Sequence, residues 1–166
     1  MVGYPLRCVV DTSLLIDLYI GKIMLDFFKL PFDFVAPDVI IAELYEPNGK
    51  LLIKLGLQEQ ELTGDQILEV IQLRKQYRQP SVNDLFALVL ARILKATLLT
   101  NDGNLRKVAH QEGIVTHGTL WVLDEMVRIK IIPPFQAIDA LSAMRERGSR
   151  FPPDEYDKRI RKWLNE

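Results

Sequence analysis

The chain has 166 residues and 48% of them are hydrophobic, so it is long and apolar enough to bury the core of one domain. Its formal net charge of −1 excludes a globally basic surface, so a nucleic acid would have to be held by a local patch. The single cysteine, Cys8, excludes an intramolecular disulfide and a zinc site built from several cysteines. No signal pattern opens the sequence and no apolar run approaches the roughly 20 residues of a membrane span, so we expect a soluble, cytoplasmic protein.

Short apolar segments alternate with helical patterns along the chain. Strands are predicted at 6–10, 32–36, 57–62, 97–100 and 114–116, and the polar segment 57–62 suits an edge of the sheet. The first helix is capped by Thr12-Ser13 and interrupted at Gly21. The later helices are predicted at 22–30, 37–46, 50–55, 63–78, 83–95, 104–112, 119–130, 135–147 and 154–164.

This alternation predicts a short parallel sheet with helices on both faces, a three-layer α/β/α sandwich. We find no internal repeat and no linker, so residues 1–166 are expected to form a single domain. Its core would lie at about 7–120, followed by a C-terminal helical extension at about 119–166. The C-terminal ends of parallel strands lie at one edge of a sheet, and that edge is where ligands usually bind.

Two acidic residues of the apolar stretch 81–105 are predicted to meet at this edge. From Asp84 to Lys95 a helix rises about 16 Å, at about 1.5 Å per residue. From Thr97 to Asp102 an extended segment returns by about 16 Å, at about 3.3 Å per residue. The carboxylates of Asp84 and Asp102 should therefore lie at the same edge of the molecule.

Two further acids reach the same edge by topology. Asp11 follows the first strand, and Glu43 lies about five residues, or roughly 7 Å, into the helix after the second strand. Each acid also has an ordinary explanation, because Asp84 forms a capping box with Ser81, Asp11 and Asp102 suit turns, and Glu43 suits an exposed helix face. The aliphatic neighbours of Asp11, Asp102 and Glu43 favour a shared site instead.

Several carboxylates in one cleft repel each other unless a cation lies between them. Ligation by oxygen alone suits Mg²⁺ or Mn²⁺ rather than zinc. The chemistry that this site suggests is metal-assisted hydrolysis of a phosphodiester, in which the ions orient a water and neutralise charge on the phosphate.

Four features together resemble the PIN domain: Val-Val-Asp-Thr-Ser-Leu-Leu at 9–15, Glu43, Ser-Val-Asn-Asp at 81–84, and Leu-Thr-Asn-Asp-Gly-Asn-Leu-Arg at 99–106. The resemblance covers about residues 7–120. It implies a parallel-sheet nuclease fold that uses Mg²⁺ or Mn²⁺. The residues that it implies as catalytic metal ligands are Asp11, Glu43, Asp84 and Asp102, where Glu43 would be a ligand or would position the water.

The same motifs look like the VapC type, the ribonuclease toxin of toxin–antitoxin pairs. That resemblance implies RNA as the substrate, an antitoxin protein as a partner, a homodimer, and no membrane contact. The segment from Gly118 to Tyr156 is longer than in the compact toxins and is similar to a branch of predicted PIN proteins. Its apolar helices are expected to supply the dimer interface.

Other folds that place acidic residues at the C-terminal edge of a parallel sheet suit the sequence less well. A haloacid-dehalogenase-type phosphatase needs a second aspartate two residues after its nucleophile, where this chain has Ser13. A response-regulator receiver pairs adjacent acids at the end of its first strand, where Asp11 stands alone. The remaining alternative is a non-catalytic PIN-fold binding module that uses the acid edge and the helical tail for partner contacts.

Polar residues beside the acids can orient a carboxylate or a metal-bound water. For most of them, a role as a helix cap or in a turn is an equally good explanation. These residues are Thr12, Ser13, Ser81, Thr100 and Asn101. Basic residues near the edge are candidates for binding RNA phosphates. Alternatively, they lie on a solvated helix face and complement the helix dipole. These residues are Arg74, Lys75, Arg78 and Arg106. His117 follows the last strand and could face the cleft, although we expect an ordinary hydrogen-bonded histidine. Trp121 and Trp163 are expected to anchor the core or an interface.

Overall fold

A computed structural model describes residues 5–166, and its centre is a sheet of parallel strands in the order β3-β2-β1-β4-β5. The strands are β1 (Leu6–Val10), β2 (Phe32–Pro37), β3 (Gln58–Gln60), β4 (Thr97–Leu99) and β5 (Thr116–His117). The helices before the tail are α1 (Thr12–Ile20), α2 (Met24–Phe27), α3 (Asp38–Glu43), α4 (Gly49–Leu55), α5 (Gly64–Gln76), α6 (Val82–Leu94) and α7 (Gly103–Gln111). The tail helices are α8 (Thr119–Arg128), α9 (Pro134–Glu146) and α10 (Pro153–Leu164).

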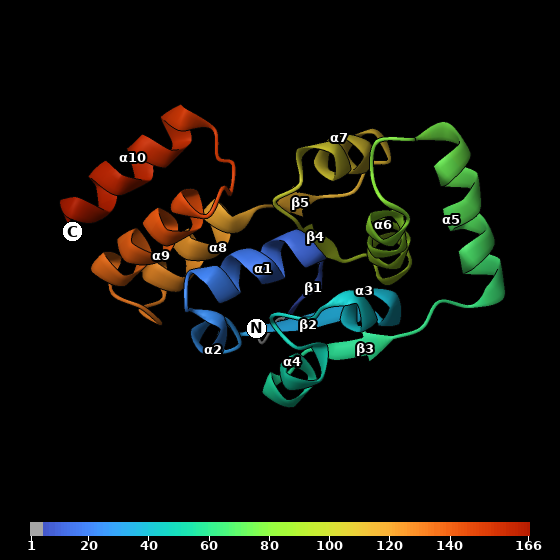
Figure 1. Cartoon of the computed structure of the whole chain (residues 1–166), viewed down its shortest axis with the longest axis horizontal. Coiled ribbons are helices and arrows are strands. Elements are labelled where there is room, and N and C mark those ends of the chain that lie inside the picture. Colours follow the sequence, from blue (N-terminus) through green and yellow to red (C-terminus); the bar gives the residue numbers. More distant parts are fainter. Residues whose placement is uncertain (1–4) are drawn as a thin grey trace.

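Helices lie on both sides of the sheet, which confirms the predicted α/β/α architecture. The helix α6 packs against β1, β2 and β4, and α5 covers α6 on its outer side. On the other side α1 packs against α2, α8 and α9. Figure 1 shows α5 and α10 at opposite ends of the molecule, with the sheet between them.

The C-terminal part of the central strand β1 is buried on both of its faces. Cys8, Val9 and Val10 are fully buried, and Val9 lies opposite Val35 of β2 and Leu98 of β4. The part of the strand that helices cover on both faces needs apolar side chains at successive positions, whereas Leu6 and Arg7 at its start are exposed. Burial raises the pKa of the Cys8 thiol to about 12, with the charge of Asp33 as a smaller cause. Cys8 is therefore a buried thiol that stays protonated in the strand.

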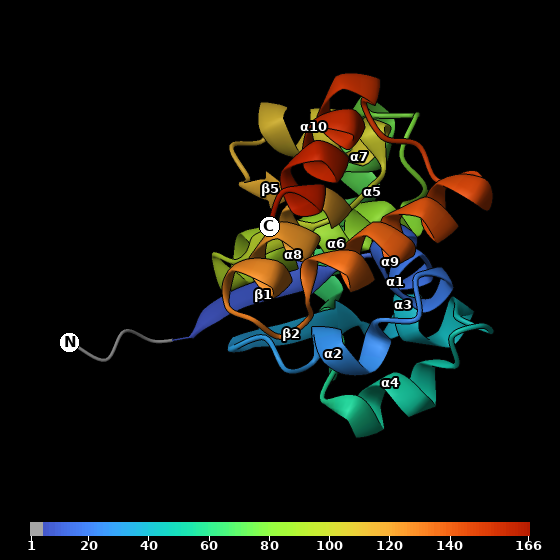
Figure 2. The ribbon, with the colours of Figure 1, turned by 90° about the vertical axis from the view of Figure 1, so that its left-hand side faces the viewer.

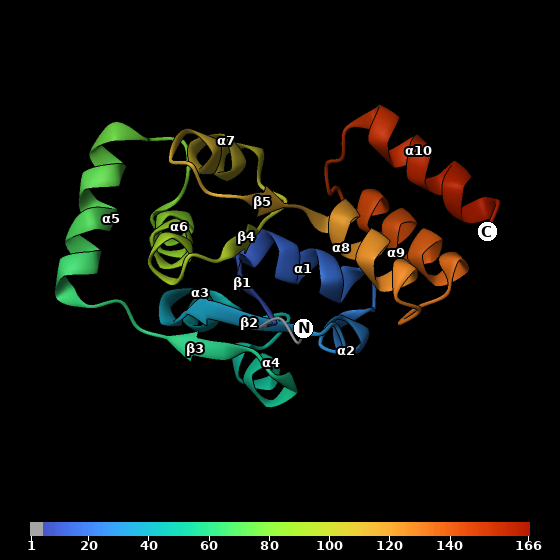
Figure 3. The same ribbon diagram turned by 180° about the vertical axis from the view of Figure 1, so that it is seen from behind.

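The tail helices α8 and α9 pack against α1, and α10 packs on α9 (Figures 2 and 3). Gly21 permits this approach, because a Cβ atom there would lie 2.6 Å from Cε of Met144 and 3.1 Å from Cβ of Ala140. Trp163 is 2% exposed, which confirms its predicted role as an anchor of the core. Within residues 5–166 no helix combines the length and the apolar character that a membrane crossing requires.

Several predicted boundaries were wrong in ways that local geometry explains. The helix expected at 22–30 shrinks to α2, because Lys22 has a positive φ of 57° and separates α2 from α1. The helix expected at 37–46 ends at Glu43, because Leu44 turns to an extended backbone with ψ of 122°. The last strand lies at Thr116–His117 rather than 114–116, so His117 is inside the sheet and pairs with Leu99.

Candidate active site

Four acids from separate segments are positioned at the C-terminal edge of the sheet. Asp11 follows β1 and is the N-cap of α1, and Asp102 follows β4 and is the N-cap of α7. Asp84 lies in the first turn of α6, and Glu43 is the last residue of α3. Helix caps thus fix three of the four carboxylates in place, so capping and a shared site are compatible explanations for the same residues.

Asp11 is fully buried and is the most restrained of the four. Its Oδ2 accepts a 2.6 Å hydrogen bond from the Thr100 hydroxyl, and its Oδ1 accepts from the Ser13 hydroxyl at 2.9 Å and from the Leu14 N–H at 3.2 Å. Burial raises the pKa of Asp11 to about 7; these hydrogen bonds lower it and the charge of Asp84 raises it further. The fold therefore holds an acid whose ionisation is costly unless a positive charge comes near.

Two of the predicted supporting residues join the loops after β1 and β4. The Ser13 hydroxyl oxygen accepts the backbone N–H of Asn101 at 3.0 Å, and the Thr100 hydroxyl oxygen accepts the N–H of Asp102 at 3.0 Å. Both hydroxyls also donate to Asp11, so one network sets the spacing between Asp11 and Asp102.

Asp84 and Asp102 each use one carboxylate oxygen in a cap. Oδ2 of Asp84 accepts the Ser81 N–H at 2.9 Å, which completes a capping box, and Oδ1 of Asp102 accepts the Leu105 N–H at 2.9 Å. Burial raises the pKa of Asp84 most, the hydrogen bonds to Ser81 lower it, and the charges of Asp102 and Glu43 raise it again. Asp84 therefore lies within electrostatic reach of the other three acids.

Glu43 is exposed but held by two side chains. Its Oε1 accepts from the Thr12 hydroxyl, and its Oε2 accepts from Nδ2 of Asn83 at 2.6 Å. The sequence predicted a supporting role for Thr12 but missed Asn83. The available signal was its position directly before Asp84 in the Ser-Val-Asn-Asp motif.

The donor chemistry of this edge matches a hard divalent cation, since the four side chains offer carboxylate oxygens and no sulfur or imidazole. The caps leave Oδ1 of Asp84 and Oδ2 of Asp102 to other partners. Across residues 5–166 no three acidic, histidine or cysteine side chains are already close enough together to form a metal site. The four acids would have to converge further to coordinate one ion.

The sequence matches the model of the PIN-domain family DUF3368 over residues 7–165. The chain belongs to the PIN-domain family. PIN domains are generally nucleases and commonly use divalent metals. The match extends through the tail helices, whereas the motif resemblance covered only about residues 7–120, and it does not single out the VapC branch.

The PIN fold is also found in a solved structure similar to this one. A PilT N-terminus domain protein from the hyperthermophilic archaeon Sulfolobus solfataricus superimposes with a TM-score of 0.51, over 74% of this chain and 94% of that chain. The two sequences are 13% identical, so this likeness concerns the fold alone. No curated protein matches the sequence.

The basic residues predicted to contact RNA fall into three groups in this PIN domain. Arg74 donates to the backbone carbonyls of Arg78 and Pro80, so it fixes the chain that leads into α6. Lys75 and Arg78 are exposed, and their contact with RNA stays a prediction. Arg106 lies in α7 close to Gly118, since a Cβ built on Gly118 would be 3.3 Å from its Nη1.

Trp121 is partly buried against the core, as predicted, and its ring also contacts His117. Their rings stack with centroids 4.2 Å apart and planes 8° from parallel, and Trp121 also stacks on Phe32 at 5.9 Å. Both residues also line a cavity, so His117 faces a cleft. Burial and the charge of Arg106 lower the pKa of His117, while Glu125 raises it, which favours a neutral imidazole in this stack.

Proposed function

We propose that this PIN-domain protein hydrolyses phosphodiester bonds of single-stranded RNA in a reaction that depends on Mg²⁺ or Mn²⁺. The observation that carries the proposal is the position of Asp11. It is a fully buried carboxylate, with its pKa raised to about 7, at a sheet edge where three further acids gather. A purely structural role for these acids does not require their like charges to lie so near one another. A bound cation would reduce the repulsion between the carboxylates.

The residues of the chain would orient the reacting groups. Thr100, Ser13 and the Leu14 N–H hold Asp11 in one orientation, and the two caps hold Asp84 and Asp102. Such restraint fixes the carboxylates before a cation and a substrate bind, which lowers the entropy lost on reaching the transition state.

Asp11, Asp84 and Asp102 would hold the metal, and Glu43, oriented by Thr12 and Asn83, would hold it or position the attacking water. A divalent ion supplies an activated water and neutralises charge on the phosphate.

The test is cleavage of single-stranded RNA in EDTA and after addition of Mn²⁺ or Mg²⁺. We expect cleavage by the wild type only with metal, and a loss of about 100-fold or more in Asp84→Asn and Asp102→Asn. Asparagine keeps an oxygen for the cap, so the fold should survive. Asp65→Asn is the matched control, because Asp65 is an exposed acid in the first turn of α5. Metal-independent cleavage, or full activity in both edge variants, would refute the proposal.

The toxin role within this proposal is supported by the resemblance of the motifs to VapC, which also suggests a homodimer and an antitoxin partner. The alternative, a non-catalytic binding module, would use the acid edge and α8–α10 for partner contacts. Expression of the wild type and of Asp84→Asn in growing cells separates the two. Growth arrest by the wild type alone supports the toxin, and equal growth with both chains counts against it.

A further inference from the structure

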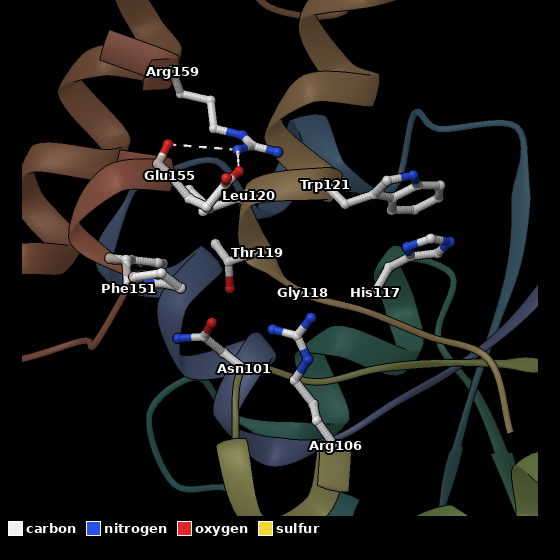
Figure 4. Close-up of a pocket in the computed structure, with 11 residues that line it drawn as sticks. Asn101, Arg106, His117, Gly118, Thr119, Leu120, Trp121, Phe151, Glu155 and Arg159 are labelled. Carbon is white, nitrogen blue, oxygen red and sulfur yellow. Dashed lines mark hydrogen bonds and ion pairs between the residues drawn. The ribbon is translucent and has the colours of Figure 1, made fainter. Parts of the chain in front are cut away.

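A cavity of about 340 Å³ lies beside the acid edge, between the start of α8, the first turns of α7 and the loop before α10 (Figure 4). Its lining combines backbone at Gly118 and Thr119 with the side chains of Arg106, His117 and Phe151. A volume of this size accommodates a small organic group such as a nucleobase or a sugar phosphate. None of the four acids lines this cavity, and of the basic residues predicted to contact RNA only Arg106 does.

This cavity continues into a second one that reaches the acids. The second cavity, of about 660 Å³, is lined by Ser13 and Asp102 of the acid edge. The two share Asn101, Arg106 and Phe151 as lining residues. A flexible chain with one unit in the first cavity can therefore extend along the second to Asp102.

Arg106 gives the shared wall a positive charge that no acid neutralises. Within residues 5–166 its guanidinium forms no ion pair, and Figure 4 shows it projecting between Asn101 and His117. The other cation of the first cavity, Arg159, is occupied by Glu155 and by Asp124. An anionic group entering the cavity would therefore meet Arg106 as its available partner, and a guanidinium binds phosphate well.

Phe151 supplies an aromatic surface on the side of the cavity opposite His117 (Figure 4). Its ring is only half-buried, and its aromatic neighbour Tyr156 is 6.2 Å away and tilted by 37°. Trp121, in contrast, already stacks with both His117 and Phe32. Phe151 is thus the aromatic ring here with room for a stacking partner.

The loop that carries Phe151 is held in place before any ligand binds. The Ser149 hydroxyl donates to the buried carboxylate of Asp17, and Nδ2 of Asn101 donates to the backbone carbonyl of Arg150 at 3.4 Å. These bonds tie the loop to α1 and to the segment after β4. Because this wall of the cavity is already ordered, a ligand binds without the entropy loss that ordering the loop would cause.

We infer that this cavity binds one nucleotide of the RNA strand, with its base on Phe151 and its phosphate on Arg106, while the strand continues through the second cavity to the acids. The inference rests on the proposed function for the direction of the strand. Stacking on an aromatic ring accepts any base, so the site would favour single-stranded RNA without reading its sequence.

Binding of a labelled oligouridylate and of an abasic oligomer of equal length, both in EDTA, tests the inference. We expect the wild type to prefer the oligouridylate by about tenfold, the usual scale of one stacked base. Phe151→Leu keeps an apolar side chain in the loop and should lower that preference to about threefold or less. Phe135→Leu is the matched control, because Phe135 is 68% exposed on α9 and should leave the preference unchanged.

Arg106→Ala tests the phosphate contact. It should weaken binding of both oligomers about equally and reduce the slope of log affinity against log salt by about 0.7, the value for one phosphate on a single strand. Lys107→Ala removes the same charge from the next position of α7, which lines a different cavity, and should have a smaller effect on the slope.

An unchanged base preference in Phe151→Leu, or an unchanged salt slope in Arg106→Ala, would overturn the inference. Competition by free uridine monophosphate as strong as by the oligomer would also overturn it, because the site would then serve a free nucleotide. Thermal melting of each variant verifies folding. RNA cleavage with Mn²⁺ by the same proteins reports on the proposed function separately, since the binding measurements need no metal.

Discussion

Asp11 and Asp17, at the start and within α1, are both buried, but different groups surround them. Asp11 caps α1 at the sheet edge, where Asp84 adds a like charge. Asp17 lies in the same helix and is 4% exposed, but it faces only hydrogen-bond donors, from Thr119 at 2.8 Å and from Ser149. Burial raises the pKa of Asp17 as well, and the hydrogen bonds from Ser149, Thr119 and Asn101 lower it.

The comparison separates a structural acid from an acid placed for a ligand. Donors on several sides satisfy Asp17, which joins α1 to α8 and to the loop before α10. Burial and, to a smaller extent, the charge of Asp84 oppose the ionisation of Asp11, so a cation that arrives would stabilise its charged form. Burial of an aspartate is therefore a weaker functional signal than burial beside other acids.

Metal binding should give the largest difference between the two aspartates. At a Mn²⁺ concentration about 100 times the dissociation constant, we expect the wild type to gain about 2.7 kcal/mol of stability. Asp17→Asn should gain as much, while Asp11→Asn should gain much less. Thermal melting with EDTA and then with millimolar Mn²⁺ or Mg²⁺ measures the gain. Equal gains in Asp11→Asn and Asp17→Asn would show that Asp11 takes no part in metal binding.

Removal of the structural acid should destabilise the fold. Asp17→Ala leaves the Thr119 and Ser149 hydroxyls without their acceptor, which costs about 1–3 kcal/mol. The raised pKa of Asp17 makes its ionised form costly, so the wild type itself loses stability as pH rises above about 4. Urea unfolding should therefore show the larger loss in Asp17→Ala at acidic pH. A loss that grows toward neutral pH would contradict this account of Asp17.

The acid at the sheet edge should instead impose a pH dependence on the metal-free protein. The pKa of Asp11 is about 7 when folded and about 4 when unfolded, so the folded state retains a proton that the unfolded state releases. Stability should fall between about pH 4 and 7, by up to about 1.4 kcal/mol per pH unit for this group. Asp11→Asn should flatten that slope and be the more stable protein at neutral pH. Urea unfolding in EDTA across this range measures the slope, and identical slopes would refute the prediction.

The smallest expected effect concerns the exposed cations near the end of α5. The double change Lys75→Ala and Arg78→Ala should reduce the salt slope of RNA binding by about 0.7 for each phosphate that these two side chains neutralise. Lys54→Ala combined with Arg161→Ala removes the same charges from exposed positions of α4 and α10. If both pairs change the slope equally, Lys75 and Arg78 belong to a solvated surface. Arg74 is left intact because it binds backbone carbonyls.

Much of the candidate site could be predicted because it follows from local rules. An apolar strand, a helix with a capping box and the return of β4 place Asp84 and Asp102 at one edge through rise per residue alone. The same rules could not reveal Asn83 as the partner of Glu43, because that contact joins residues 40 positions apart. They selected Asp11 because it follows a strand, but they gave no sign that Asp17 would be buried and bound by Thr119 and Ser149.

The sequence by itself determined the order of strands and helices, the parallel sheet and the edge at which the acids gather, because periodicity, caps and chain length act within short segments. Only the tertiary structure decided how the tail lies. Asp17 meets Ser149 across 132 positions, and this contact brings Phe151 to the wall that Arg106 and Gly118 complete. Such a cavity depends on packing between segments that are distant in the sequence. Many arrangements of these segments satisfy the same local sequence pattern, and side-chain contacts select one of them.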